Sequence, residues 1–306
     1  VRGPLASNPN ELTGTDVAWG SVLLSVSSFL GIVIRFATMV VLTRELGVHD
    51  YGLYILAYSA QLAVGSGYFL GAGRAVIADI SREIGLKQYG RVRRLLTEYT
   101  GLQLVLGLLL AGGVAIFIPI FGDSLLHERA PEWLGLIAVL VAMTALNRIA
   151  SVGLTSHGNF GVIAAQQLLE VIAKLIAIVV LVFGMDRGVS GVLEADIVAL
   201  AVGQAVSWVI LIRSIAYLRF HAPHPGWIFP GILKAHGKWT VLTSMFTQLT
   251  ESAANWVMAG ILNTEAVGIY AVGKRSVGFA KAVLPLKTVL SPLMARRVSD
   301  QAQVRR

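Results

Sequence analysis

Several basic residues of this sequence lie within long apolar runs, where a charged side chain is unusual. Arg35 lies in the first apolar run, Lys174 in the fifth, and Lys274 and Arg275 in the eighth. An ionisable group at membrane depth is costly, so each of these predicts a cavity or a partner. Lys281 follows Lys274 by two helical turns on nearly the same face. Facing a cavity, such groups would bind anions, and the planar guanidinium suits phosphate.

Two acidic residues share these apolar runs. Glu170 precedes Lys174 by four residues, so an ion pair along one helix face is the leading expectation. The alternative places Lys174 in a cavity where Glu170 modulates it.

Glu251 has Gln248 and Asn255 on its own helix face. Its carboxylate could bind a proton or a sodium ion for coupling, or pair with Arg35 or Arg275, and the sequence leaves both open. Away from the ends of the apolar runs, the five cations outnumber these two acids, which favours an anionic ligand.

The composition indicates which elements hold these residues. The 306 residues are 55% hydrophobic and 14% charged, with a mean hydropathy of +0.71, and soluble domains carry about a quarter charged residues. The apolar residues form blocks of about 20, the length of a membrane-spanning helix. We therefore predict an all-α polytopic membrane protein of eight spans, roughly 19–43, 51–72, 98–121, 133–156, 161–184, 192–217, 239–262 and 266–292.

The distribution of Lys and Arg predicts the orientation. With residues 1–18 as a cytosolic tail, most of the 25 basic residues fall in cytosolic segments, whereas the outer loops hold Arg44, Arg129 and Arg187. This asymmetry predicts a multi-pass protein of the inner (cytoplasmic) membrane. It also accounts for the net charge of +8 without a nucleic-acid partner.

The segment 73–97 is the longest early cytosolic loop. Ile77, Ile80, Ile84 and Leu86 give it a partly amphipathic pattern, which suggests a helix lying on the inner leaflet. A solvated basic loop is an equal alternative.

A short motif recurs in the sequence. LTRELGVHDYGLY starts at Leu42 and LNTEAVGIYAVG at Leu262, so that Gly52 and Tyr54 correspond to Gly268 and Tyr270 at an offset of 216 residues. Six predicted spans lie within this offset, and an even number preserves orientation, as in transporters with parallel repeats.

The repeat predicts a first lobe of six helices over 19–217, a linker over 218–238, and the start of a second lobe over 239–306. Because two helices cannot mirror six, we expect a truncated chain.

The run VLTRELGVHDYGLY, from Val41 to Tyr54, resembles the turn that opens the O-antigen and polysaccharide flippases. AVGIYAVGKR, from Ala266 to Arg275, is similar to the opening of that family's second lobe. The family belongs to the multidrug/oligosaccharidyl-lipid/polysaccharide exporter (MOP) superfamily. The resemblance implies two lobes around a central cavity, with a cationic residue on the first helix facing it, as Arg35 would.

The resemblance also implies that the protein moves a polyprenyl-diphosphate-linked oligosaccharide, with membrane lipids and glycan polymerase or export proteins as further candidate partners. A cation-coupled multidrug exporter of the same superfamily is the alternative, and a non-transporting scaffold for glycan export is another.

Enzyme motifs are lacking in the sequence. Gly268 to Arg275 lacks the Ser or Thr that a phosphate loop needs after Lys274, and neither HExxH nor GxSxG occurs. We expect neither enzymatic activity nor a metal or cofactor.

Overall fold

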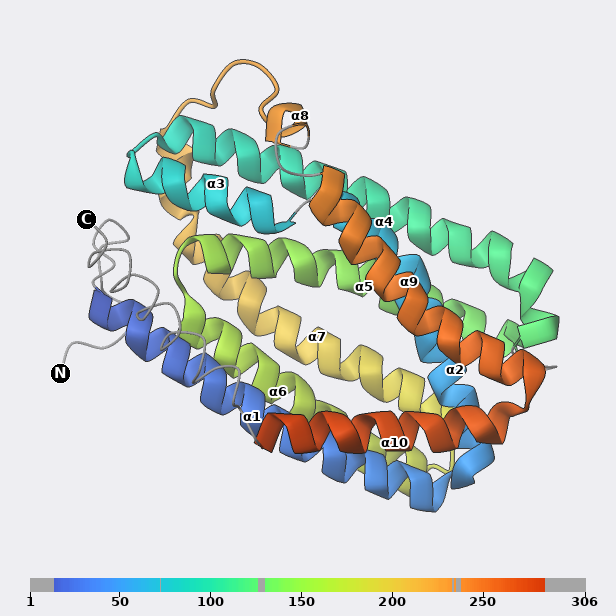
Figure 1. Cartoon of the computed structure of the whole chain (residues 1–306). Helices are drawn as coiled ribbons and strands as arrows, with labels where there is room; N and C mark the ends of the chain where they lie inside the picture. Colours follow the sequence, from blue (N-terminus) through green and yellow to red (C-terminus); the bar gives the residue numbers. More distant parts are fainter. Residues whose placement is uncertain (1–13, 72, 126–129, 233, 235–237, 284–306) are drawn as a thin grey trace, which may run out of the picture.

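The computed structural model describes residues 14–71, 73–125, 130–232, 234 and 238–283, with only the backbone described at the ends of some helices. This part of the chain is a bundle of helices without a strand (Figure 1). The long helices are α1 (Gly14–Glu45), α2 (Gly47–Gly65), α4 (Tyr89–Leu125), α5 (Ala130–Ser156), α6 (Phe160–Ile178), α7 (Gly188–Ser214), α9 (Lys238–Ile261) and α10 (Thr264–Val283). Shorter helical segments are η1 (Ser66–Gly71), α3 (Gly73–Gly85), η3 (Val179–Gly184), η4 (Ala216–Phe220) and α8 (Phe229–Ile232).

Several helices have the length and apolar character of membrane spans. Within the described residues these are Val22–Glu45, Tyr89–Ile116, Trp133–Ser156, Phe160–Gly184 and Gly188–Phe220. Large apolar side chains on their outer faces, such as Leu108 at 74% exposure and Ile176 at 59%, suit contact with lipid. An all-α polytopic membrane protein is therefore confirmed. The number of eight spans stays a prediction. Helix α2 is long and apolar enough only when it is taken together with α3, from which it is bent by 45°, and α9 and α10 are not apolar enough over the length of a span. Residues 284–292 lie outside the described residues.

The amphipathic segment after α2 is helical, as one of the two expectations had it, but its apolar side chains face other helices. It folds as α3, and the next helix, α4, already begins at Tyr89 instead of near residue 98. Val76, Ile80 and Ile84 of α3 are buried in a core that α4 and α5 share, so the apolar face of α3 packs on protein rather than on the inner leaflet. The segment is therefore a helix and not a solvated loop, and its apolar side packs on protein.

Helix α2 occupies the centre of the bundle, where it packs against α1, α5, α7, α9 and α10 (Figure 1). Its residues from Tyr51 to Ala57 are buried on every side. A helix that is covered all round needs apolar or aromatic residues on all faces, and this segment reads YGLYILA. The end of the first copy of the repeated motif therefore lies in the core of the bundle.

The two copies of the repeated motif contact each other reciprocally. A Cβ atom added at Gly52 of α2 would lie 2.1 Å from the carbonyl oxygen of Thr264. A Cβ atom added at Gly268 of α10 would lie 2.5 Å from the carbonyl oxygen of Val48. Since Val48 and Thr264 are also 216 residues apart, each copy presents its glycine to the same backbone carbonyl of the other. Glycine at both positions allows the two helices to approach this closely.

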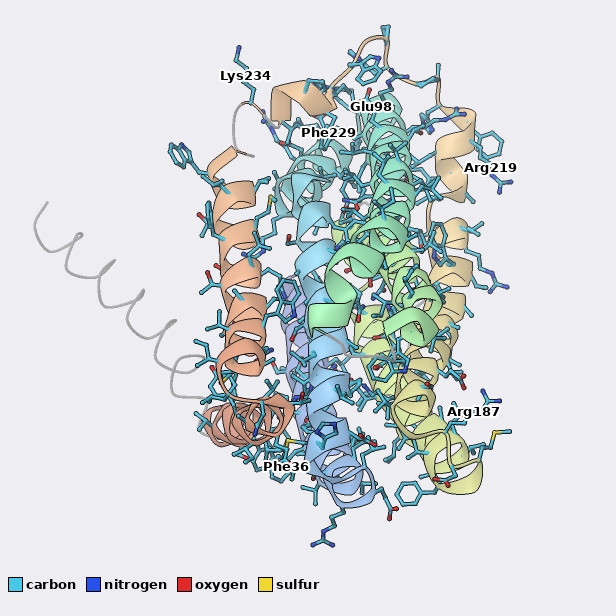
Figure 2. The ribbon with its side chains drawn as sticks, turned by 90° about the vertical axis from the view of Figure 1, so that its right-hand side faces the viewer. Phe36, Glu98, Arg187, Arg219, Phe229 and Lys234 are labelled. Atoms are coloured by element: carbon cyan, nitrogen blue, oxygen red, sulfur yellow. The ribbon has the colours of Figure 1, made fainter. Side chains whose placement is uncertain are left out.

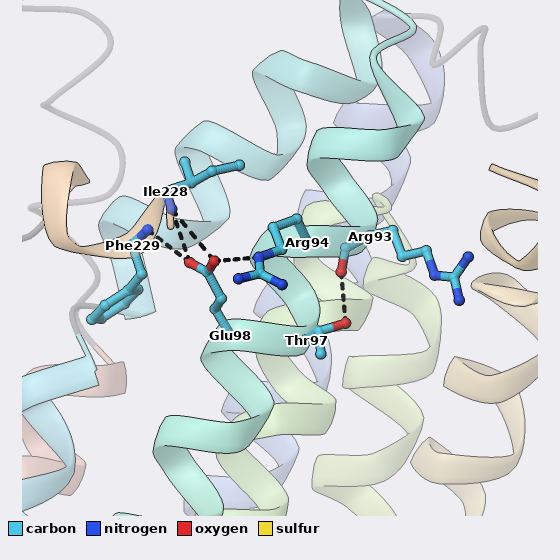
Figure 3. A network of polar contacts seen from close by, with 6 residues as sticks. All are labelled: Arg93, Arg94, Thr97, Glu98, Ile228 and Phe229. Carbon is cyan, nitrogen blue, oxygen red and sulfur yellow. Dashed lines mark hydrogen bonds and ion pairs between the residues drawn. The ribbon is translucent and has the colours of Figure 1, made fainter. Parts of the chain in front are cut away.

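The segment between α7 and α9 is held on α4 near the end of the bundle where Lys234 lies, opposite the end marked by Arg187 (Figure 2). The Glu98 carboxylate of α4 accepts hydrogen bonds from the backbone N–H groups of Ile228 and Phe229, at 3.1 and 2.9 Å, and from Arg94 Nε at 2.6 Å (Figure 3). A charged acceptor on two backbone donors is a strong arrangement, so the segment is anchored on α4.

The close glycine contact yields a stability prediction. Gly52→Ala should lower the free energy of unfolding by about 1–3 kcal/mol, because the added methyl group pushes α2 away from α10. Gly268→Ala should act in the same direction. The measurement is the thermal unfolding midpoint of the protein in detergent.

Gly101→Ala is the matched control for these glycine variants, since nothing lies within 4 Å of a Cβ atom added at that position of α4. It should be neutral or stabilising, because alanine favours a helix over glycine by up to about 1 kcal/mol. Equal midpoints for Gly52→Ala and Gly101→Ala would contradict the close packing.

Candidate functional site

A cavity of about 870 Å³ lies between α1, α2, α6 and α7 on one side and α9 and α10 on the other. The charged residues that line it are Arg35, Glu170, Lys174, Asp196, Glu251, Lys274 and Arg275. The structure thus brings together side chains from five helices that the sequence separates by up to 240 positions. Of the predicted site residues, only the Lys281 side chain lies outside the described residues.

Lys174 is neutralised by a carboxylate on another helix. Its Nζ forms an ion pair with Asp196 Oδ1 of α7 and donates a hydrogen bond to Tyr54 Oη of α2 at 2.9 Å. Tyr54 in turn donates to Asp196 Oδ2 at 3.0 Å, which closes a three-residue network. The expected ion pair between Lys174 and Glu170 is therefore wrong. Lys174 pairs with Asp196 of another helix, while Glu170 accepts a hydrogen bond from Gln166.

Asp196 lines the cavity but was not among the residues predicted from the sequence. With the sixth span placed at 192–217, this residue fell at a span end, where a carboxylate needs no special explanation. In the structure α7 begins at Gly188, so Asp196 lies two turns inside the helix. The sequence signal for it was the presence of two acids, Glu194 and Asp196, with one nearby base, Arg187. In the structure Arg187 pairs with Glu194, and Asp196 lines the cavity.

Arg275 is held by tyrosines rather than by an acid. Its Nη1 donates to Tyr51 Oη at 2.8 Å, and its guanidinium lies 5.9 Å from the centre of the Tyr51 ring. Tyr51, Tyr54 and Tyr58 follow one another along α2 with ring centres 6.1 Å apart. Across the described residues, Arg275 has no carboxylate within 4 Å. This cation therefore faces the cavity with its charge uncompensated by an acid.

Glu170 belongs to a different hydrogen-bond network from that of Lys174. It accepts a hydrogen bond from Gln166 Nε2 at 2.7 Å. Its side chain fits against α7 because residue 203 is glycine: a Cβ atom added there would lie 2.3 Å from Glu170 Cγ. Arg35 lines the cavity beside it, and no hydrogen bond or ion pair joins Arg35 to another residue of the described set.

Glu251 and Lys274 form a loose pair on the α9–α10 side of the cavity. The distance from Lys274 Nζ to Glu251 Oε2 is 3.8 Å, and both side chains are about half exposed, at 46% and 55%. Glu251 therefore pairs with neither Arg35 nor Arg275, the two partners the sequence had suggested. Asn255, one turn along α9, donates instead to Ser59 Oγ of α2 at 2.6 Å and so ties the two sides of the cavity together.

The arrangement of the helices is that of the MOP-superfamily transporters. It matches the MATE multidrug transporter DinF-BH with a TM-score of 0.72 at 18% identity, over 92% of this chain and 65% of that one. A MOP-superfamily transporter from Pyrococcus furiosus, described as having a binding pocket of reversed polarity, matches with a TM-score of 0.59 at 17% identity, over 91% and 62%.

The Vibrio cholerae MATE transporter VcmN in its bent form matches with a TM-score of 0.55 at 19% identity, over 92% of this chain and 67% of that one. The chain thus spans about two thirds of the length of these transporters. No curated protein sequence gives a significant match. The chain belongs to the family described as "Polysaccharide biosynthesis protein", whose model matches residues 41–306. The family that the resemblance suggested is therefore confirmed.

The two ion pairs of the cavity predict unequal costs on neutralisation. Asp196→Asn should lower the free energy of unfolding by about 3 kcal/mol, because it leaves the Lys174 ammonium without a counter-charge at a mostly buried site. The combined change Lys174→Met with Asp196→Leu should restore most of the loss.

Glu251→Gln is the matched control and should change the free energy of unfolding by at most about 1 kcal/mol, since exposed pairs contribute little. Thermal midpoints of all variants in one detergent make the comparison. Equal losses for the two single variants would show that the Lys174–Asp196 pair carries no special weight.

Proposed function

We propose that the protein translocates polyprenyl-diphosphate-linked oligosaccharide or polysaccharide units across the cytoplasmic membrane by alternating access. The observation that supports this most directly is the Arg275 guanidinium, which faces the cavity without an acidic partner among the described residues. A partly buried cation without an acidic partner favours an anionic ligand, and guanidinium geometry suits a diphosphate. The family match to polysaccharide biosynthesis proteins supports the same substrate class.

In this proposal the cavity cations differ in availability. Among the residues that the structure describes, Arg35 and Arg275 have no ion pair to break, and Lys274 can exchange the loose contact with Glu251 for a phosphate oxygen. Lys174 becomes available only when Asp196 or Tyr54 gives up its bond. We therefore assign the diphosphate to Arg35, Lys274 and Arg275, with Lys174 and Lys281 as secondary members of the site. Glu251 and Glu170 would set the local charge or couple it to a cation.

The physical purpose of such a cavity is to replace water around the phosphates and sugars. Carrying these groups through hydrocarbon unaided is prohibitively costly, whereas fixed cations and hydroxyl groups lower that cost. The lipid tail can stay in the membrane while two lobes related by the repeat rock about the site. The reciprocal contact between Gly52 and Gly268 would be one of the lobe contacts.

Binding of a lipid diphosphate tests the proposal. Arg275→Gln should weaken the affinity of the purified chain for farnesyl diphosphate by about 10- to 100-fold, the effect of losing a hydrogen bond from a charged donor. Arg35→Gln should act in the same direction. The dissociation constant is measured by thermophoresis in detergent.

Arg187→Gln is the charge-matched control for this experiment. Arg187 pairs with Glu194 before the start of α7, away from the cavity, so its loss should leave the affinity within about twofold. Unchanged affinity in both Arg275→Gln and Arg35→Gln would remove these residues from the site.

A multidrug exporter is the second candidate, because three carboxylates line the same cavity as the four cations. The fold neighbour DinF-BH is described as a multidrug transporter. Against this candidate, a binding pocket of reversed polarity is described for the Pyrococcus furiosus transporter. The excess of cations in the cavity of this chain likewise favours an anionic ligand, the lipid diphosphate, over a cationic drug. Tetraphenylphosphonium, a lipophilic cation, is a suitable probe for the choice. Saturable binding of this cation that Glu251→Gln abolishes, without binding of farnesyl diphosphate, would favour the drug exporter.

A further inference from the structure

A second, smaller cavity of about 320 Å³ lies within the first six helices, between α1, α5 and α6. Its polar lining consists mainly of uncharged side chains: the amides Asn147, Gln166 and Gln167 and the hydroxyls Ser28 and Ser151. We call it the amide pocket. At about 30 Å³ per water molecule, the amide pocket has room for about ten water molecules, which is enough to hold one sugar ring but not a glycan chain.

A hydrogen-bond network in the lining of the amide pocket is centred on Gln166, which is only 4% exposed. Its Nε2 donates to Asn147 Oδ1 at 2.6 Å and to Glu170 Oε1 at 2.7 Å, and its Oε1 accepts from Ser207 Oγ at 2.6 Å. Both amide hydrogens and the amide oxygen of Gln166 are therefore engaged. A satisfied buried network of this kind fixes the side chains that it holds, here Asn147 and Glu170.

Other polar groups of the amide pocket have no protein partner within the described residues. No hydrogen bond there uses Asn147 Nδ2, Gln167 Nε2 or the Ser151 hydroxyl. At membrane depth, polar groups are expensive unless they bond to something, and apolar residues would fill the same space at lower cost. The amide pocket is thus built with free donors that face a cavity large enough for a ligand.

The chemistry of these free groups favours a neutral, hydroxyl-rich ligand. Amide N–H groups donate and a serine hydroxyl both donates and accepts, which matches the mixed donors and acceptors of sugar hydroxyl groups. A phosphate would need more than the one cation, Arg35, that borders the amide pocket. A bare metal cation would need several converging carboxylate or carbonyl oxygens, and Glu170 is the one carboxylate in the described lining.

The amide pocket and the larger cavity meet at Arg35 and Glu170, which line both. We propose that the amide pocket binds a sugar ring of the lipid-linked glycan, close to the diphosphate held in the larger cavity. This inference rests on the proposed function, and it adds a second site that binds the hydroxyl groups of the glycan rather than the charge of the diphosphate. Arg35 at the junction would hold the phosphate nearer to the sugar.

The test compares two kinds of ligand on the full chain purified in detergent. One is farnesyl diphosphate, and the other is the same lipid carrying one glucose, galactose or N-acetylglucosamine. At least one glycosylated form should bind the unmodified chain more tightly than the bare diphosphate. The double variant Ser151→Ala with Gln167→Met should weaken that glycosylated ligand by about tenfold, the loss of two hydrogen bonds, while its affinity for the bare diphosphate should stay within about twofold.

The matched control removes one hydroxyl and one amide outside the amide pocket. Thr155→Ala with Gln88→Met fits this need, because neither residue lines either cavity, and both affinities should be unchanged. If no sugar improves binding, or if the pocket variant weakens both ligands equally, the amide pocket does not bind the sugar, while tight diphosphate binding would leave the proposed function standing. If neither ligand binds the unmodified chain, both proposals fail.

Discussion

The cost of placing charge inside a membrane-spanning bundle is the constraint on which the other features of this structure turn. Lys174 is tolerated because Asp196 and Tyr54 surround its ammonium group. Arg275 is tolerated because the tyrosines of α2 accept a hydrogen bond and present a ring face. The two arrangements differ in net charge, because Asp196 cancels the charge of Lys174 whereas the tyrosines leave Arg275 positively charged.

The tyrosines connect the cavity to the frame of the bundle. Tyr51 and Tyr54 belong to the same short motif as Gly52, whose missing side chain allows α10 to approach α2. One turn of α2 therefore sets the spacing of the helices with one face and holds the cavity cations with another. A change in the packing of α2 and α10 should therefore also alter the position of Arg275, which α10 carries.

In the proposed function, the larger cavity recognises charge and the amide pocket recognises hydroxyl groups. The cations favour any polyanion, so by themselves they would discriminate poorly among lipid-linked glycans. Free amide and hydroxyl groups discriminate better, because a ligand that fails to match them leaves buried polar groups unpaired. Arg35 and Glu170 lie where the two spaces meet, so the electrostatic and the hydrogen-bonding parts of recognition adjoin each other.

Residue types along the chain were enough to predict the polytopic all-α class and four cations that line one cavity, because hydropathy and the cost of intramembrane charge are local properties of each residue. The family followed from two short motifs, from Val41 to Tyr54 and from Ala266 to Arg275. They also located the repeated glycine. Only the tertiary structure decided how acids and bases pair. Lys174 forms an ion pair with Asp196 of another helix, while Glu170, its neighbour on the same helix, accepts a hydrogen bond from Gln166. The amide pocket, too, exists only once α1, α5 and α6 converge, since Ser151 and Gln167 have no spacing that would reveal it. Pairing in a bundle depends on how helices are rotated against one another, and that rotation is fixed by packing across helices rather than by neighbours along the chain.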